Sequence, residues 1–154
     1  MSAPPDVPLI RKALPGDVTR IRAIARAAYS KYISRIGREP APMLADFAAS
    51  IAADHVVVIE SAGQLAGYLS GWPEIDAYFI EGIAVDPAQQ SEGLGRRLMK
   101  RAISEARRLN LPALQLYTNV AMTENLSIYT HMGFVETHRT VEDGYNRVYM
   151  RLAI

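Results

Sequence analysis

Residues 83–99, IAVDPAQQSEGLGRRLM, run from an apolar segment into a basic amphipathic one through a loop with two glycines. Unpaired amides at a helix N-terminus carry partial positive charge, and Gly93 and Gly95 let a ligand approach the backbone closely. The loop suits a phosphate, although a plain strand-to-helix turn uses glycines in the same way. The spacing Gln90-x-x-Gly93-x-Gly95 lacks the third glycine of a dinucleotide fingerprint and the Gly-Lys-Ser/Thr of a P-loop, so neither of those motifs is indicated.

The segment after this loop is the clearest helix in the sequence. Its apolar residues repeat at helical spacing until Asn110 and Pro112 end the run. They are Leu94, Leu98, Ala102, Ile103, Ala106 and Leu109. Similar patterns predict helices at 14–33, 43–54 and 123–133, the last capped by Thr123, with a loop or lid between the first two.

Strand signals fill most of the remaining chain. We expect strands at 9–13, 55–61, 63–72, 76–85 and 113–118, and a hairpin over 134–154 that turns near Asp143-Gly144. Strands and helices then follow in the order β-α-α-β-β-β-α-β-α-β-β. This order predicts an α/β (α+β) fold with a mixed, mostly antiparallel sheet of six to seven strands and helices on both faces.

Composition narrows the class of protein. The chain has 154 residues, which suits a single domain over 1–154, with the proline-rich residues 1–8 as a loose tail. Its formal net charge of +1 gives no reason to expect nucleic acid or a membrane surface as a partner. With no cysteine and no apolar run of about 20 residues, we expect a cytoplasmic protein. Its three histidines lack metal-binding spacing, so no metal is expected.

Two segments together resemble a known family. IAVDPAQQSEGLGRRLM resembles the acyl-CoA binding motif of the GNAT acyltransferase superfamily, in which a strand ending V-x-P is followed by Q/R-x-x-G-x-G/A. LQLYTNVAMTENLSIYTHMGF resembles its second signature, with Tyr129 four residues before Gly133-Phe134. The predicted order of elements is also that of the family, so the resemblance extends over essentially the whole chain. It implies binding of acetyl-CoA and transfer of the acetyl group from its thioester to an amine.

The resemblance also implies where coenzyme A would lie. Backbone amides of the glycine loop would hold the pyrophosphate, and backbone groups of the preceding strand would meet the pantetheine arm. These residues are Gln90, Ser91, Gly93, Leu94, Gly95 and Arg96 for the loop, and Ile83, Ala84 and Val85 for the strand. A bulge in that strand, eased by Gly82, would open a slot for the thioester.

Basic residues follow the loop in the first turns of the helix. One or two of them could meet a phosphate, or they could form a solvated basic face. The candidates are Arg96, Arg97, Lys100 and Arg101, with the solvated interpretation favoured for Arg101.

The sequence departs from the family pattern at two positions. Glu92 stands beside the expected phosphates, where an anion weakens binding unless it points outward, as we expect it to. Met122 replaces an asparagine that hydrogen-bonds coenzyme A in the family. Asn125 or Asn119 can substitute for it, and Asn125 is preferred because it lies one helical turn before Tyr129.

Transfer to an amine requires a base. An alkyl ammonium has a pKa of about 10.4 and must lose a proton before it attacks a thioester. Glu81 is the only charged residue between Tyr78 and Val85, and strict alternation places it on the same side as Ile83 and Val85. We expect Glu81 to be the general base, acting through water. The structural alternative is a glutamate that is paired with a neighbouring arginine or projects from the bulge.

Tyr129 matches the family position that protonates the departing thiolate. Its reference pKa of about 10 exceeds the roughly 8.5 of a thiol, so a hydrogen bond to the sulfur is easier than full proton transfer. A helix tyrosine packed in the core would give the same sequence pattern.

The acceptor amine is left open by the sequence. Its site is expected between the lid at 29–43, the strand around Trp72, and the last hairpin with His138, Arg139, Tyr145 and Arg147. A small-molecule amine and a peptide amine both fit. The alternative to an enzyme is a non-catalytic acyl-CoA binding or sensing domain, and a homodimer through an exposed strand is possible for either.

Overall fold

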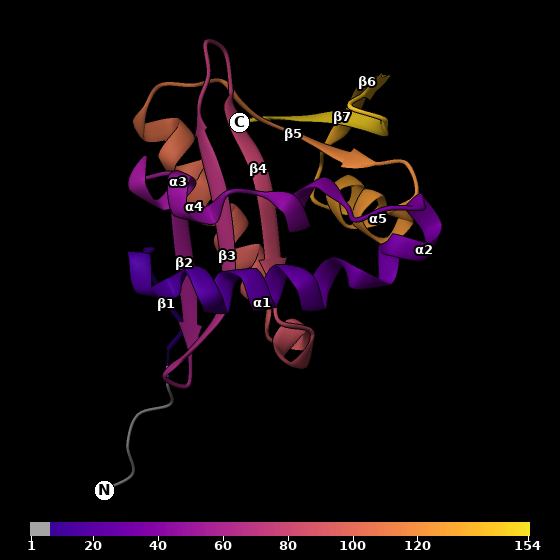
Figure 1. The fold of residues 1–154 in the computed structure, drawn as a ribbon. Helices are drawn as coiled ribbons and strands as arrows, with labels where there is room; N and C mark the ends of the chain where they lie inside the picture. The colour runs from indigo at the N-terminus through magenta and orange to yellow at the C-terminus, as the bar shows by residue number, and fades with distance from the viewer. Residues whose placement is uncertain (1–6) are drawn as a thin grey trace, which may run out of the picture.

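The computed structural model describes residues 7–154, except for the side chains of residues 90–92. Within that part, one seven-stranded sheet has the order β1-β2-β3-β4-β5-β7-β6 (Figure 1). The strands are β1 Leu9–Lys12, β2 Val56–Ser61, β3 Gln64–Pro73, β4 Tyr78–Val85, β5 Ala113–Asn119, β6 Val135–Glu142 and β7 Tyr145–Ala153. All neighbouring strands are antiparallel except β4 and β5. The predicted mixed, mostly antiparallel sheet is confirmed.

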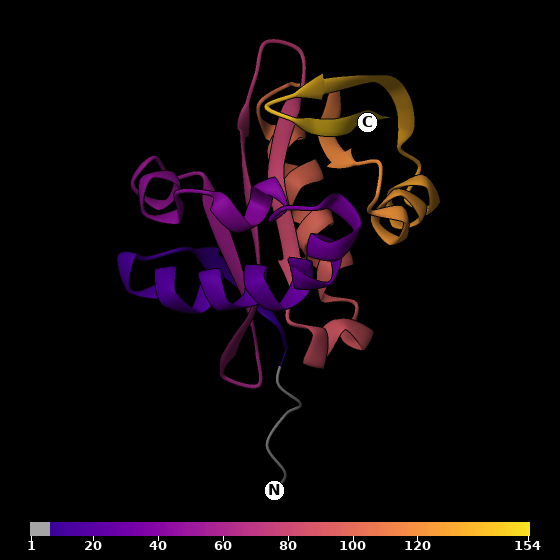
Figure 2. The same cartoon turned by 45° about the vertical axis from the view of Figure 1, so that its right-hand side comes forward.

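Helices lie on both faces of this sheet (Figure 2). The α-helices are α1 Val18–Tyr29, α2 Ile33–Ile36, α3 Phe47–Ala52, α4 Leu94–Arg108 and α5 Thr123–His131, and short 3₁₀ turns are Pro15–Asp17, Ser30–Tyr32, Ala41–Leu44 and Pro87–Glu92. One buried cluster joins α4 and α5 to the sheet, and a second joins α1 and α3 to its other face. The periodic leucines of α4 account for the first: Leu94 and Leu98 are both 0% exposed.

The ends and caps of the helices differ in places from the sequence prediction. The first helical run extends to Ile36, because Gly37, at φ 86°, ends it in the left-handed conformation. The next helix begins only at Phe47, capped by the Asp46 side chain, which accepts from the Ala49 amide. Thr123 is not a cap: α5 begins after Met122 without a side-chain cap, and the Thr123 hydroxyl donates instead to Glu124.

β4 is the strand that shapes the site. Ser70 pairs with Gly82 and Gly71 with Ile80, so Glu81 is an extra residue in β4. Gly71 is required there, since a Cβ on it would lie 2.6 Å from the Phe79 carbonyl oxygen. Parallel pairing of β4 with β5 covers only Tyr78–Ile80, whereas its pairing with β3 continues to Val85. The expected bulge and splayed strand are both present.

Candidate functional site

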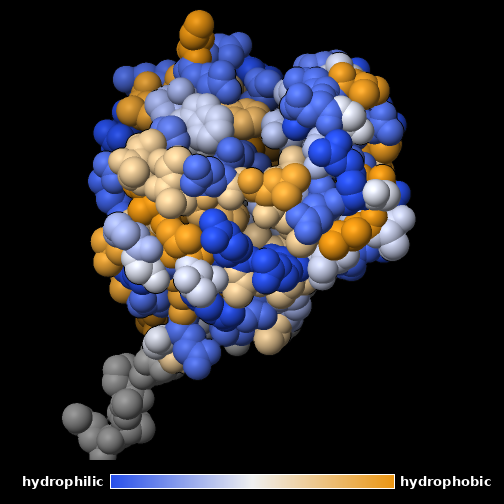
Figure 3. Space-filling view, in the orientation of Figure 1, coloured by the Kyte–Doolittle hydropathy of each residue, from blue (hydrophilic) through white to orange (hydrophobic). Residues whose placement is uncertain are grey.

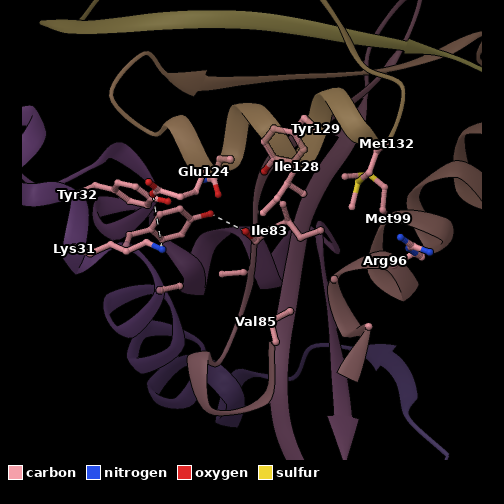
Figure 4. A pocket seen from close by; sticks show the side chains of 16 residues that line it. Lys31, Tyr32, Ile83, Val85, Arg96, Met99, Glu124, Ile128, Tyr129 and Met132 are labelled. Atoms are coloured by element: carbon pink, nitrogen blue, oxygen red, sulfur yellow. Dashed lines mark hydrogen bonds and ion pairs between the residues drawn. The ribbon is translucent and has the colours of Figure 1, made fainter. Parts of the chain in front are cut away.

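A cavity of about 430 Å³ lies where β4 separates from β5. We call it the slot. Its walls come from α1, the turn after α1, β4, the start of α4, and α5 (Figure 4). The lining residues are Ala28, Tyr29, Lys31, Tyr32, Ile83, Ala84, Val85, Gly93, Gly95, Arg96, Met99, Glu124, Asn125, Ile128, Tyr129 and Met132. Most of the residues expected to meet coenzyme A therefore lie around one cavity.

The strand side of the slot is formed by Ile83, Ala84 and Val85. One of its polar groups already has a partner, because the Tyr29 hydroxyl donates to the Ile83 carbonyl at 2.7 Å. Burial raises the pKa of Tyr29 well above its usual value, so this hydroxyl is a stable donor. Tyr29 thus holds α1 against β4 at the wall of the slot.

The start of α4 closes one end of the slot. Gly93 is its N-cap with φ 72°, and the first helical bond runs from the Arg97 amide to the Gly93 carbonyl. The amides of residues 94–96 precede that bond and lack a helical acceptor, which is the arrangement that binds anions. The Leu94 side chain points into the core, and Gly95 lies against Val85, where an added Cβ would be 3.8 Å from a methyl group.

The structure does not describe the side chains of three residues of this loop. The backbone of Pro87–Glu92 forms a 3₁₀ turn. The side chains of Gln90, Ser91 and Glu92 lie outside the described residues, so the expected outward orientation of Glu92 stays a prediction.

A second cavity, of about 580 Å³, continues the slot between α4 and α5. The two share Arg96, Met99, Ile128 and Met132. Lys100 and His131 lie along the second cavity, so its rim carries basic groups. Arg101 lines a different cavity, beside Tyr78 and Glu105. Of the basic residues considered, Arg96 and Lys100 are therefore placed near the slot, and Arg101 is not.

Tyr129 lies in the slot wall contributed by α5. It is 8% exposed and packs on Phe134, with ring centroids 5.7 Å apart. Burial, together with the nearby Tyr32, raises the pKa of Tyr129 well above its usual value. A neutral phenol is thus favoured, which suits hydrogen-bond donation more than loss of a proton.

Asn125 and Asn119 are separated by the structure. Asn125 lines the slot, and its side-chain amide donates to the Met122 sulfur at 3.6 Å. The Asn119 side chain accepts from the Ala121 amide at 2.9 Å and lies outside the slot lining. The geometry supports the preference for Asn125.

An ion pair joins α2 to α5 at Glu124, which lines the slot. Arg35 donates to both carboxylate oxygens of Glu124, at 2.8 and 3.0 Å. Arg35, and after it Tyr32, lowers the pKa of Glu124 to about 2. Burial and the hydrogen bond with Glu124 raise the pKa of Tyr32 to about 12. These contacts, like that of Tyr29, were missed in the sequence, where the tyrosines at 29 and 32 showed only helical spacing.

Glu81 does not face the slot, contrary to the expected alternation with Ile83 and Val85. It accepts a hydrogen bond from the Ser70 hydroxyl at 3.0 Å. Ser70 lies on the face of β3 that carries Tyr68, which belongs to the buried cluster of α1 and α3. Ile83 packs with the opposite cluster. The bulge is the physical reason, because one extra residue reverses the side on which the following residues point.

The Glu81 side of the sheet carries a row of aromatic rings. Six rings run across the strands with consecutive centroids 4.4–5.6 Å apart. They are His55, Trp72, Phe79, Tyr117, Tyr149 and His138. Figure 3 shows this face hollowed between the end of the β3–β4 hairpin and the β6–β7 hairpin.

The last hairpin and the predicted lid meet on this same side. The Arg147 guanidinium lies 4.2 Å from the Tyr117 ring centroid, and Arg147 is paired with Glu142 at 3.7 Å. The Tyr145 hydroxyl donates to the Glu39 carbonyl at 2.6 Å, and Arg38 lies over the Tyr145 ring. The loop after α2 is thus attached to the β6–β7 turn, as expected for two walls of one site.

Comparison with known proteins establishes the family. Residues 19–134 match the family model described as the acetyltransferase (GNAT) family. The chain belongs to this family. It is 32% identical over 94 residues to the L-methionine sulfoximine/L-methionine sulfone acetyltransferase of Salmonella typhimurium, an alignment covering 58% of this chain and 55% of that one. The chain spans about half the length of the curated relatives it matches.

Solved structures share the fold. The coenzyme A complex of PaiA N-acetyltransferase from Thermoplasma acidophilum superposes with a TM-score of 0.78 at 14% identity, covering 96% of this chain and 99% of that one. The ribosomal-protein-S18-alanine N-acetyltransferase of Escherichia coli gives 0.75 at 21% identity, covering 96% and 94%. Within residues 7–154, no helix is long and apolar enough to cross a membrane.

Proposed function

We propose that this chain is an acetyl-CoA-dependent N-acetyltransferase that passes the acetyl group directly to a primary amine in a ternary complex. One observation carries the proposal: β4 splays from β5 at the bulge, so that the slot with Tyr129 opens at the edge of β4, while Glu81 lies beside Ser70 outside the slot lining. The two substrates can then approach the same short piece of strand from opposite sides.

The slot fits coenzyme A in chemistry as well as in shape. The amides at the start of α4 suit a pyrophosphate, and Arg96 and Lys100 add positive charge where the slot continues between α4 and α5. The apolar walls formed by Ile83, Met99 and Ile128 suit a pantetheine arm. The proposal gives Asn125 a hydrogen bond to this arm, which its position in the slot lining supports.

The side chains divide the chemistry between them. Glu81 removes a proton from the acceptor ammonium, leaving a neutral amine. The amine nitrogen forms a bond to the thioester carbon and loses its second proton to solvent, and the carbon–sulfur bond then breaks. Tyr129 donates a hydrogen bond to the departing sulfur, and the thiolate takes up a proton to leave as coenzyme A thiol.

A thiol-release assay with acetyl-CoA tests the proposal. The panel should hold a free amino acid, a peptide with a free N-terminus, a polyamine and a lysine side chain blocked at its α-amine. The expected result is turnover with at least one member and loss of turnover in Glu81→Gln. Tight binding of coenzyme A without turnover on any amine would instead favour the acyl-CoA sensing domain.

A further inference from the structure

The Tyr68 hydroxyl is buried without a hydrogen-bond partner among the described residues. Tyr68 is 1% exposed, and its ring packs edge-on against Phe47, with centroids 5.3 Å apart. An unpaired buried hydroxyl is costly, and native proteins satisfy such groups with internal water or use them in a site. Packing against Phe47 explains why the Tyr68 ring is buried, but it does not explain why the unpaired hydroxyl is buried.

This hydroxyl lies beside the bulge of β4. Tyr68 pairs with Ala84, and a Cβ built on Gly82 would have the Tyr68 hydroxyl and ring edge as its nearest neighbours, both at 3.7 Å. An alanine methyl group at position 82 would thus be in ordinary van der Waals contact with the Tyr68 hydroxyl. Ser70, two residues further along the same face of β3, is 1% exposed and donates to the Glu81 carboxylate at 3.0 Å.

The charged and titratable groups that face Tyr68 come from three elements. They are Glu81 on β4, Tyr129 on α5 and Tyr29 on α1. Burial, and after it the charge of Glu81, raises the pKa of Tyr68 far above its usual value. The α3 side of the ring is covered by Phe47, which carries no charge. Tyr68 thus stays a neutral donor and acceptor near both Glu81 and Tyr129.

From this arrangement we infer that Tyr68 and Ser70 are positioning residues for Glu81. Ser70 fixes the carboxylate by its hydrogen bond, and the Tyr68 hydroxyl holds a water beside Gly82 that links the acceptor ammonium to Glu81. The water takes a proton from the ammonium and passes one of its own to the carboxylate, which leaves a neutral amine, a water and a carboxylic acid. The inference rests on the proposed function, since it assigns helpers to the same base.

The test is the pH dependence of kcat/KM for three variants and a control. Tyr68→Phe keeps the ring and its packing, Ser70→Ala removes the donor to Glu81, and Gly82→Ala fills the space for the water. We expect each to lower kcat about tenfold, the scale of one lost hydrogen bond to a charged group, with an unchanged Kd for coenzyme A. The pH profile of kcat/KM should differ from that of the wild type in Ser70→Ala, which loses the hydrogen bond to the Glu81 carboxylate.

Tyr78→Phe is the matched control, because Tyr78 is a buried tyrosine of the opposite face. It should keep the wild-type kcat and pH profile. A Tyr68→Phe variant that also keeps them would overturn the inference while leaving the proposed function intact. A change in melting temperature with no change in kcat or the pH profile would assign Tyr68 and Ser70 to packing alone, and would overturn it too. A wild-type chain that turns over no amine would overturn the proposed function and this role together.

Discussion

The two sides of β4 are built in different ways. The slot side includes two neighbouring segments of one sequence motif, Ile83–Val85 and the start of α4, and is completed by residues of α1 and α5. The Glu81 side is assembled from side chains of separate strands, with Ser70 on β3, Tyr117 on β5 and Tyr149 on β7. One side can be specified by a short local motif, whereas the other depends on how distant segments pair. The four predictions below test this division.

Removal of the Glu81 charge should have the largest effect. Glu81→Gln should lower kcat by about 10²–10⁴, the usual contribution of a general base. Because Glu81 points away from the slot, acetyl-CoA should bind the variant with its wild-type Kd, measured by calorimetry. Glu105→Gln on α4 is the control and should leave both values unchanged. A large loss of acetyl-CoA affinity in Glu81→Gln would contradict the separation of the two sides.

Tyr129→Phe tests the proposed hydrogen bond from Tyr129 in the slot to the departing sulfur of coenzyme A. We expect kcat to fall by up to about 10², with coenzyme A still bound. Because burial raises the pKa of Tyr129, the phenol stays protonated through the working range, and the wild-type rate should show no descending limb due to it between pH 7 and 9. Measurement of kcat across that range in both proteins checks this, and an unchanged kcat in Tyr129→Phe would remove Tyr129 from the chemistry.

Gly93→Ala tests whether the backbone amides at the start of α4 bind the pyrophosphate. Gly93 has φ 72°, so alanine should cost about 1 kcal/mol of folding free energy and weaken coenzyme A binding about tenfold by moving the amides of α4. Gly63→Ala is a matched control, with φ 77° in the β2–β3 turn and open space around it. It should show the same loss of stability in urea, with an unchanged Kd. Equal Kd values for the two variants would count against pyrophosphate binding by the amides at the start of α4.

The smallest effect concerns the ion pair at the end of β4. Arg20 on α1 lies 2.6 Å from Asp86, and the Ala88 amide and then Arg20 hold the pKa of Asp86 below its usual value. A lowered pKa in the folded state stabilises the protein above the unfolded pKa of about 3.9 and loses this contribution as the pH falls through the lower value. Asp86→Asn should therefore cost up to about 1 kcal/mol at pH 7, since the pair is partly exposed.

Urea unfolding at several pH values measures this contribution. The difference between wild type and Asp86→Asn should shrink as the pH falls from 5 toward 2. Asp54→Asn, at a side chain that is 73% exposed, is the control. A difference that stays constant down to pH 2 would rule out ionisation of Asp86 as its cause.

The contrast between the two sides of β4 also explains which features could be predicted from the sequence. The order of strands and helices follows from periodicity, and the hairpin turn at Asp143-Gly144 follows from two residues that adopt positive φ, 53° and 79°. The slot residues follow from one motif because the chain itself brings them together. Glu81 was correctly identified as the one charge in its strand, but its side of the sheet was wrong, because strict alternation does not hold across the expected bulge, where Glu81 is the extra residue.

The residues that contact Glu81 and Ile83 could not be predicted from the sequence, for a related reason. Ser70 and Tyr68 come next to Glu81 only through the register of β3 and β4, and Tyr29 contacts Ile83 across 54 positions of sequence. Hydroxyl side chains of this kind look the same in a sequence whether they face solvent, core or site. Tertiary contacts, rather than local preference, decide between these environments.

The most direct test of the central claim is the structure of this chain bound to coenzyme A. The account predicts the pyrophosphate on the amides at the start of α4, and the sulfur between Ile83 and Tyr129, with Glu81 on the far side of β4. Coenzyme A bound outside the slot, or a sulfur lying on the Glu81 side away from Tyr129, would contradict it.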